Sequence, residues 1–194
     1  MLIKSSFEVA QPVDKVWQFF DNIPQVAACL PGTELTEDLG NNKYGGKVAI
    51  RMGPVKLQFT GTAQIRERDD AAKRMVVDAA GADEKGRGQA AMSGTATLAP
   101  SRGGTTVDVD LDLQLSGPAA QYGRGMISDV TAILMRDFAS NMQSRITAID
   151  RGVSPDRVAT GRSASGFTIA LRAMRLALGR VLRRFFLPYQ PNPS

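Results

Sequence analysis

Alternation of apolar and polar residues over positions 33–115 is the feature that most constrains how this chain can fold. The pattern is clearest over 55–66, where apolar or small residues occupy every second position. Because side chains of a β-strand point alternately to its two faces, such a segment predicts a strand with one face in solvent. Turn-forming residues, among them those at 40–42 and 102–104, separate the alternating segments. The sequence therefore predicts six consecutive antiparallel strands joined by short turns.

Segments of different period flank this region. Residues 2–9 are predicted to form a first strand, and two short helices are expected at about 13–21 and 25–30. A broad apolar stripe at helical spacing over 118–150 predicts one long helix after the strands. We therefore expect an α+β fold, in which a curved antiparallel sheet wraps around the long C-terminal helix and two short helices follow the first strand.

Small residues at the inward-facing strand positions predict a hollow beneath the long helix, because a close-packed interior would need bulkier side chains there. The alternatives are close contact between helix and sheet, or glycines that bend the sheet. The small positions are Gly46, Gly61, Ala63, Ala79, Gly81, Ala90, Gly94 and Ala96. With few inward charges, the hollow is suited to holding an apolar ligand. The predicted ligand-binding residues are Phe20, Leu30, Ile50, Phe59, Gly61, Met92, Gly94, Leu111, Tyr122, Met126, Val130 and Leu134.

The chain contains no histidine and a single cysteine, Cys29. This composition excludes Ser-His-Asp and Cys-His catalytic sites and histidine metal sites. A lone cysteine forms neither an intramolecular disulfide nor a cysteine-cluster metal site, and its apolar neighbours predict a buried, inert thiol. We expect no catalytic residue, no metal site and no covalently bound cofactor. No signal peptide and no membrane-spanning segment are expected either.

Charge is distributed unevenly along the chain. Residues 151–194 contain eight arginines and one acid, whereas the remainder carries a net charge of −2. The composition of 151–166 predicts a flexible linker, and 188–194 form a proline-rich end. Between them, 167–187 combine an apolar stripe with arginines on the opposite half, which is typical of a helix lying in a membrane surface. The predicted membrane-binding residues are Phe167, Leu171, Arg172, Met174, Arg175, Leu178, Arg180, Val181, Leu182, Arg183, Arg184, Phe185 and Phe186.

Two other partners could use this basic segment. It could dock on a protein, either on the body of this chain or on a separate partner, or it could be a nucleic-acid arm. Nucleic acid rewards positive charge but has no use for an apolar stripe, so we expect no nucleic-acid partner. Anionic membrane lipids are the expected partner.

Several short motifs in residues 1–150 together resemble one protein family. The segments 30–32 and 59–61 are the most specific, and the N-terminal strand and helix are common to a wider superfamily. The motifs are Phe7-Glu8-Val9, Pro12-Val13-Asp14-Lys15-Val16-Trp17, Cys29-Leu30-Pro31-Gly32-Thr33-Glu34, Gly53-Pro54-Val55 with Phe59-Thr60-Gly61, and Met92-Ser93-Gly94-Thr95-Ala96. They resemble the family of the carbon monoxide dehydrogenase G subunit, which belongs to the START/Bet v1-like (helix-grip, SRPBCC) superfamily.

The resemblance implies a helix-grip fold with an apolar cavity, and a non-enzymatic accessory role beside a molybdenum-containing carbon monoxide dehydrogenase. It also implies links to membrane recruitment of that enzyme and to the supply of respiratory quinone. We therefore expect a ligand-binding domain at 1–150 that carries an isoprenoid quinone, ubiquinone or menaquinone, between membrane and dehydrogenase. The expected location is cytoplasmic, at the inner face of the cell membrane.

The alternatives are an adaptor that anchors the dehydrogenase without ligand transfer, a maturation factor, and an enzyme. Some helix-grip proteins are cyclases or hydrolases, but the absence of histidine makes an enzyme the least expected class.

Overall fold

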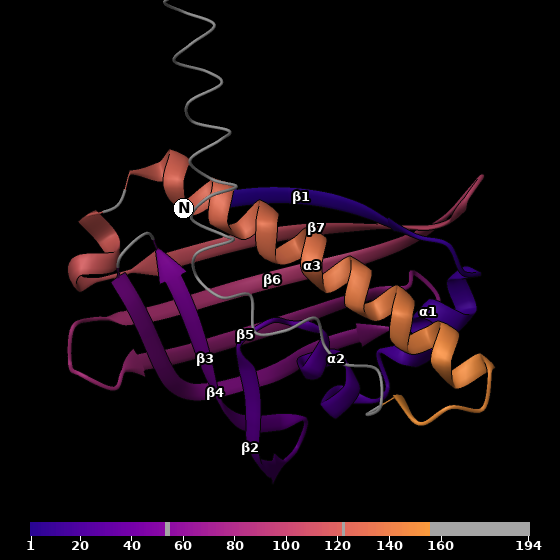
Figure 1. Ribbon diagram of the computed structural model, residues 1–194, viewed down its shortest axis with the longest axis horizontal. Coiled ribbons are helices and arrows are strands. Elements are labelled where there is room, and N and C mark those ends of the chain that lie inside the picture. The colour runs from indigo at the N-terminus through magenta and orange to yellow at the C-terminus, as the bar shows by residue number, and fades with distance from the viewer. Residues whose placement is uncertain (53–54, 122, 156–194) are drawn as a thin grey trace, which may run out of the picture.

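A seven-stranded antiparallel sheet, bent around one long helix, forms the body of the protein (Figure 1). A computed structural model describes residues 1–52, 55–121 and 123–155. Tyr122 and the predicted membrane-binding residues in 167–187 lie outside the described residues. In chain order the elements are β1 (Leu2–Val9), α1 (Val13–Phe19), α2 (Ile23–Cys29), β2 (Thr33–Gly40), β3 (Lys43–Met52), β4 (Val55–Asp69), β5 (Arg74–Asp83), β6 (Gln89–Ser101), β7 (Gly104–Leu115), the 3-10 helix η1 (Gly117–Gln121) and α3 (Arg124–Asp150).

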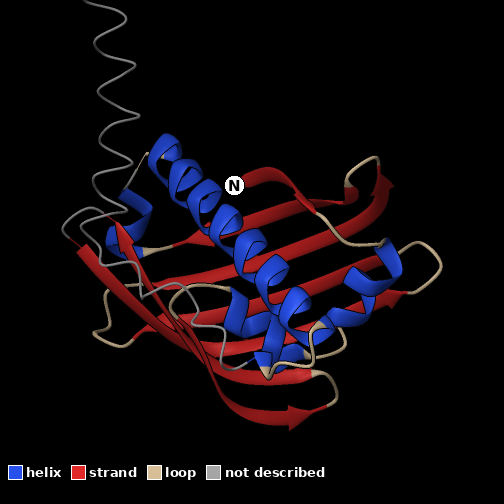
Figure 2. Ribbon diagram, turned by 45° about the vertical axis from the view of Figure 1, so that its right-hand side comes forward, coloured by secondary structure: helices blue, strands red, loops and turns tan. Residues whose placement is uncertain are grey.

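The strand order is β1-β7-β6-β5-β4-β3-β2, so β2 to β7 pair with their neighbours in sequence and β1 pairs with the last strand. The helices α1 and α2 connect β1 at one edge of the sheet to β2 at the other. The long helix α3 packs chiefly on β1 and α2 and crosses the concave face of the sheet (Figure 2). This arrangement confirms the predicted α+β fold and the six consecutive strands.

The long helix begins later than the sequence predicts, at Arg124 rather than at Pro118. Gly117 adopts a φ of +71°, and a Cβ atom there would lie 1.9 Å from the carbonyl oxygen of Arg87. This close approach turns the chain after β7, and Pro118 then lies in the 3-10 helix η1 instead of the α-helix. The backbone at Gly123 is extended, with ψ 151°, and separates the two helices.

Three glycines form a row across neighbouring strands, because Gly46 pairs with Gly61 and Gly61 pairs with Gly81. A Cβ atom at Gly61 would lie 2.0 Å from the carbonyl oxygen of Ala80. The two backbones therefore approach more closely than any side chain at this position would allow, in the region where β4 bends (Figure 1). Glycines that bend the sheet and a hollow beneath the helix are alternatives at the level of sequence, but in the structure they occur together.

Two hydrophobic clusters form the core. The larger cluster joins α1, the C-terminal half of α3 and the strands beneath them, and contains the fully buried Val16, Val107 and Met142. The smaller cluster joins β1 and β4 to the N-terminal half of α3 through Ile3, Leu57, Phe59 and Ile127. Each cluster fixes one part of α3 against the sheet, so the helix is held at both ends.

A buried carboxylate fixes the connection between β5 and β6. Asp83 is 4% exposed, and its oxygens accept hydrogen bonds from the Arg87 side chain at 2.7 and 2.8 Å. The backbone N–H groups of Gln58 and Lys85 also donate to it, each at 3.1 Å. These hydrogen bonds favour the ionised form, so they hold the pKa of Asp83 well below its usual range, with the Arg87 side chain as the main cause.

Asp83→Asn is expected to lower the thermal midpoint at pH 7 and to reduce its dependence on pH in acid. Because the folded-state pKa is lower than the unfolded one, ionised Asp83 stabilises the fold above the unfolded-state pKa of about 3.9. That stabilisation is lost as the pH falls toward the folded-state value. Thermal midpoints from pH 7 to pH 2 test this, with Asp110→Asn, an exposed acid on β7, as the control. Parallel pH curves for wild type and Asp83→Asn would contradict it.

Candidate ligand-binding site

A cavity of about 510 Å³ lies between the concave face of the sheet, α2 and α3. Its volume is within the range of about 300–1,000 Å³ that small-molecule sites occupy. The α3 side chains on its wall follow helical spacing, and α2 supplies a second, shorter wall. The α3 residues are Ile127, Val130, Thr131, Leu134, Met135 and Phe138, and the α2 residues are Ile23, Val26 and Ala27.

The sheet forms the floor of the cavity. All eight small residues identified from the alternation line it, namely Gly46, Gly61, Ala63, Ala79, Gly81, Ala90, Gly94 and Ala96. Because these side chains are short, the floor lies far enough from α3 to leave an open volume. Bulkier apolar residues of β3 to β7, including Val48, Leu57 and Leu113, complete the wall.

The structure brings together ten of the twelve residues predicted to bind a ligand. Those at the cavity wall are Phe20, Leu30, Ile50, Phe59, Gly61, Met92, Gly94, Leu111, Val130 and Leu134. That they contact a ligand stays a prediction. Tyr122 lies outside the described residues.

Met126 is placed differently from its prediction. Its side chain is 45% exposed and is not part of the cavity wall. Because α3 begins at Arg124, the inward-facing position of its first turn is Ile127, which is 8% exposed. The preceding residue is rotated by about 100° around the helix axis. It therefore points away from the cavity.

Sequence reasoning missed part of the wall. Tyr44 and Leu35 line the cavity, as do Ile23 and Val26 of α2. Tyr44 could have been predicted as a wall residue, because it lies on the same face of β3 as Gly46 and Val48. The α2 residues carry no such signal, because in a helix of seven residues apolar spacing does not reveal which surface the helix will cover.

Few polar atoms face this volume. The Thr131 hydroxyl donates to the Ile127 carbonyl at 2.9 Å, and the Lys47 ammonium pairs with Glu84 at 3.3 Å. The buried Thr33 hydroxyl has no hydrogen-bond partner within the described part of the chain. A wall composed mostly of carbon can enclose an apolar molecule and fix its position by shape.

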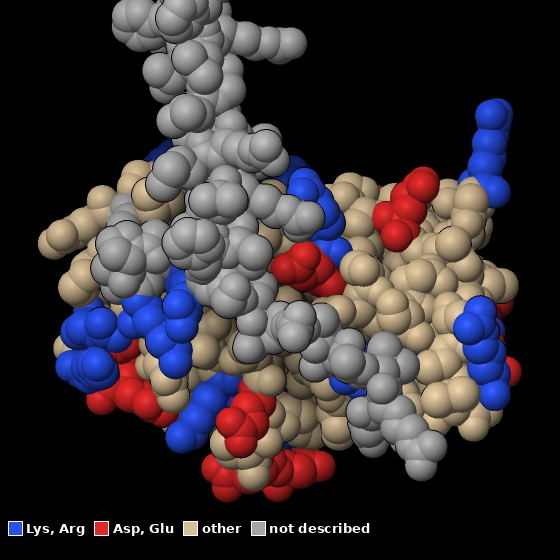
Figure 3. All heavy atoms as spheres, in the orientation of Figure 1, with Lys and Arg blue, Asp and Glu red and all other residues tan. Residues whose placement is uncertain are grey.

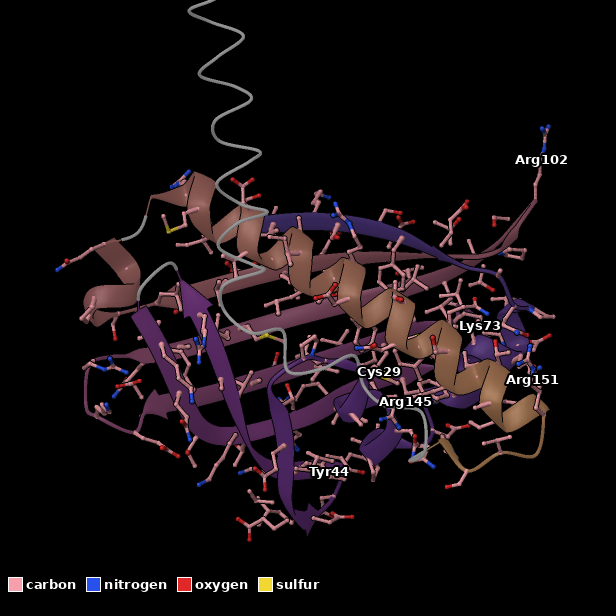
Figure 4. All side chains as sticks on the ribbon, in the orientation of Figure 1. Cys29, Tyr44, Lys73, Arg102, Arg145 and Arg151 are labelled. Atoms are coloured by element: carbon pink, nitrogen blue, oxygen red, sulfur yellow. The ribbon has the colours of Figure 1, made fainter. Side chains whose placement is uncertain are left out.

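Cys29 is buried between α2 and α3, as predicted, and is not part of the cavity wall (Figure 4). Its thiol donates to the carbonyl oxygen of Gln25 at 3.2 Å. Burial raises the pKa of Cys29 to about 12, although the Arg145 charge opposes this shift. A thiol with this pKa is almost entirely protonated at neutral pH and is a poor nucleophile or metal ligand. Over the residues that the structure describes, no group of three His, Cys, Asp or Glu side chains could hold a metal ion.

A curved antiparallel sheet closed by a long C-terminal helix over an apolar cavity defines the START/Bet v1-like helix-grip class. The family model of the carbon monoxide dehydrogenase G subunit (CoxG) matches residues 5–147, and the chain belongs to this family. No curated protein matched the chain. Over residues 1–52, 55–121 and 123–155, none of the helices combines the length and the hydropathy that a membrane-spanning helix requires.

Solved structures show the same fold at low sequence identity. A conserved protein from Geobacillus kaustophilus is 22% identical with a TM-score of 0.67, over 76% of this chain and 95% of its own. The Zhui aromatase/cyclase from Streptomyces sp. R1128 is 14% identical with a TM-score of 0.56, over 78% of this chain and 96% of its own. Ara h 8.0201 is 13% identical with a TM-score of 0.51, over 76% of this chain and 98% of its own.

Proposed function

We propose that this protein is a non-enzymatic accessory of a carbon monoxide dehydrogenase that carries an isoprenoid quinone between the membrane and the dehydrogenase. Family membership supports the link to the dehydrogenase. The apolar cavity of about 510 Å³ is the observation that carries the ligand part of the proposal. In this proposal the dehydrogenase supplies the electrons, and the protein binds and positions the quinone.

The apolar wall of the cavity supports a ligand. The cavity is partly open and its wall is almost entirely carbon, so without an occupant water would lie against apolar surface. Removing apolar surface from water is favourable by about 25 cal/mol per Å². An apolar occupant would therefore be stabilised by filling this volume.

The wall chemistry suits the apolar parts of a quinone. An isoprenoid quinone has a flat ring with two carbonyl groups and an apolar tail, and the ring faces and the tail need carbon surface. The rings of Phe59 and Phe138 and the flexible side chain of Met92 provide such surface from the sheet and from α3. The membrane part of the proposal rests on the basic, amphipathic pattern of 167–187, which lies outside the described residues.

Mass spectrometry of an organic extract tests the ligand. The full chain is purified gently from cells that make quinone, and we expect close to one quinone per protein. If the protein is folded and its extract contains no quinone, the carrier function is contradicted. The result would then favour an adaptor that anchors the dehydrogenase.

A cavity-filling variant tests the site. Ala79 lines the cavity, and its cross-strand neighbours Ala63 and Met92 line it too. In Ala79→Leu the larger side chain occupies ligand volume, so we expect at least a tenfold loss of co-purified quinone. Ala82→Leu is the matched control, because Ala82 is exposed on the opposite face of β5. Equal quinone content in both variants would show that this cavity is not the quinone site.

A further inference from the structure

Two cations face each other where β3 and β4 meet. Arg51 pairs with Lys56 across the strands, and both side chains are exposed. The four residues between them in sequence include no acid. Like charges directly opposite each other destabilise a strand pair. Among the ion pairs of the described residues, none involves Arg51 or Lys56.

The acids at this end of the molecule are already engaged. Asp83 is buried against Arg87, and Glu84 accepts from Thr60 and pairs with Lys47. The Arg87 guanidinium also donates to the carbonyl oxygen of Lys56 at 2.9 Å, which ties the β5–β6 turn to β4. This tie brings exposed Lys85 to the same end. Lys and Arg side chains lie there next to Asp and Glu side chains, at the left of the space-filling view (Figure 3).

The start of α3 adds to this positive region. Ile127 belongs to the same hydrophobic cluster as Leu57, so the first turn of α3 lies at the same end of the molecule as the start of β4. Arg124 opens the helix, is exposed, and has no acid in the first turn to balance it. A helix N-terminus already carries partial positive charge, so a cation there is unfavourable on its own. Met126, which is 45% exposed, lies in the same turn.

We propose that this basic end, defined as Arg51, Lys56, Lys85 and Arg124, binds the anionic headgroups of a lipid bilayer. Its cations come from three separate segments and do not converge on one point, so they match a plane of many phosphates better than a single small anion. An exposed methionine beside them suits the boundary between headgroups and acyl chains. The proposal rests on the membrane contact in the proposed function and deepens it, but it depends neither on quinone binding nor on residues 167–187.

The position of the basic end relates it to the cavity. Ile50, Leu57 and Ile127 line the cavity at this end of the sheet. Binding through the basic end would turn this part of the cavity wall toward the bilayer, and would shorten the path of an apolar molecule between lipid and cavity.

Vesicle binding by the full chain tests the proposal. The probes are phosphatidylcholine vesicles with and without phosphatidylglycerol, at low salt. Each basic residue near an anionic surface contributes about a fivefold factor in binding, so Arg51→Gln with Lys56→Gln should weaken binding to anionic vesicles about 25-fold. The matched control is Arg102→Gln with Arg151→Gln, which removes the same charge from the opposite end of the molecule (Figure 4).

Three results would overturn the proposal. One is an equal loss in both double variants, which would make net charge the cause. Another is an equal loss of binding by Arg51→Gln with Lys56→Gln to vesicles of phosphatidylcholine alone, which would mean that the anionic headgroups are not what is bound. The third is unchanged vesicle binding with weaker binding to purified dehydrogenase, which would make this end a protein interface. Thermal midpoints check folding, and Arg51→Gln with Lys56→Gln should be at least as stable as wild type, because the variant removes a repulsive pair. The amount of quinone that co-purifies with this variant is measured as well. Retained quinone would show that quinone binding and vesicle binding are separate properties, so that either proposal can fail without the other.

Discussion

Gly61→Val is expected to prevent the chain from reaching a stable fold. A Cβ atom at this position would lie 2.0 Å from the carbonyl oxygen of Ala80 and 2.5 Å from the Cα of Gly81. Both neighbours are backbone atoms of the paired strand, so no side chain can rotate away to make room. Only separation of β4 from β5 relieves the clash, and we expect a loss of about 4–5 kcal/mol or more in the free energy of unfolding.

Denaturant titrations of Gly61→Ala and Gly61→Val measure this loss, and the alanine variant should already be strongly destabilised. Gly125→Ala is the control, because no atom lies within 4 Å of a Cβ built there and the position is in the first turn of α3. In that helix alanine should leave stability unchanged or raise it by up to about 1 kcal/mol. A wild-type midpoint for Gly61→Ala would refute the close approach of β4 and β5.

Met142→Ala should cost about 2–5 kcal/mol of stability. Met142 is fully buried in the larger hydrophobic cluster, where α3 meets α1 and the sheet. Alanine at this position leaves a void that rigid strands and helices on all sides cannot close. The loss arises from transfer of the methionine side chain to water and from the remaining cavity.

Met126→Ala is a matched control on the same helix, because Met126 is 45% exposed. We expect its effect to stay within about 0.5 kcal/mol, since it removes little buried surface. Urea unfolding of both variants gives the comparison. Similar losses in the free energy of unfolding for the two variants would contradict the exposed position of Met126 in the first turn of α3.

The fold could be predicted from the sequence largely because alternation reports strand faces directly. On β4 the alternation continues from Leu57 to Ile65 without a break, and Leu57, Phe59 and Ala63 indeed line the cavity. On β2 the same reasoning fails after Leu35. A bulge between Leu35 and Glu37 shifts the register, and Leu39 is 46% exposed. A bulge depends on how the partner strand pairs, and the β2 sequence alone does not contain that information.

The candidate site could be predicted as far as the sheet extends. Strand parity placed Gly94 and Met92 at the cavity wall correctly, because parity is independent of tertiary contacts. The helical side was less predictable. The start of α3 depends on the contact between Gly117 and the Arg87 carbonyl, which joins segments that are distant in sequence. When the first residue of the helix is predicted wrongly, the residues of its first turn are assigned to the wrong faces. Met126 is then assigned to the cavity, although in the structure it is exposed to solvent.

The cavity lies where the two hydrophobic clusters meet, and members of both clusters form its wall. The apolar ligand proposed above would therefore act as part of the core that joins them. A ligand that binds only the folded chain stabilises it by about 2.7 kcal/mol at a hundred times its Kd. With the proposed ligand bound, the protein would be opened and degraded by cellular proteases far less often than in the empty form. The amount of this protein in a cell would consequently follow the supply of its ligand, without any change in gene expression.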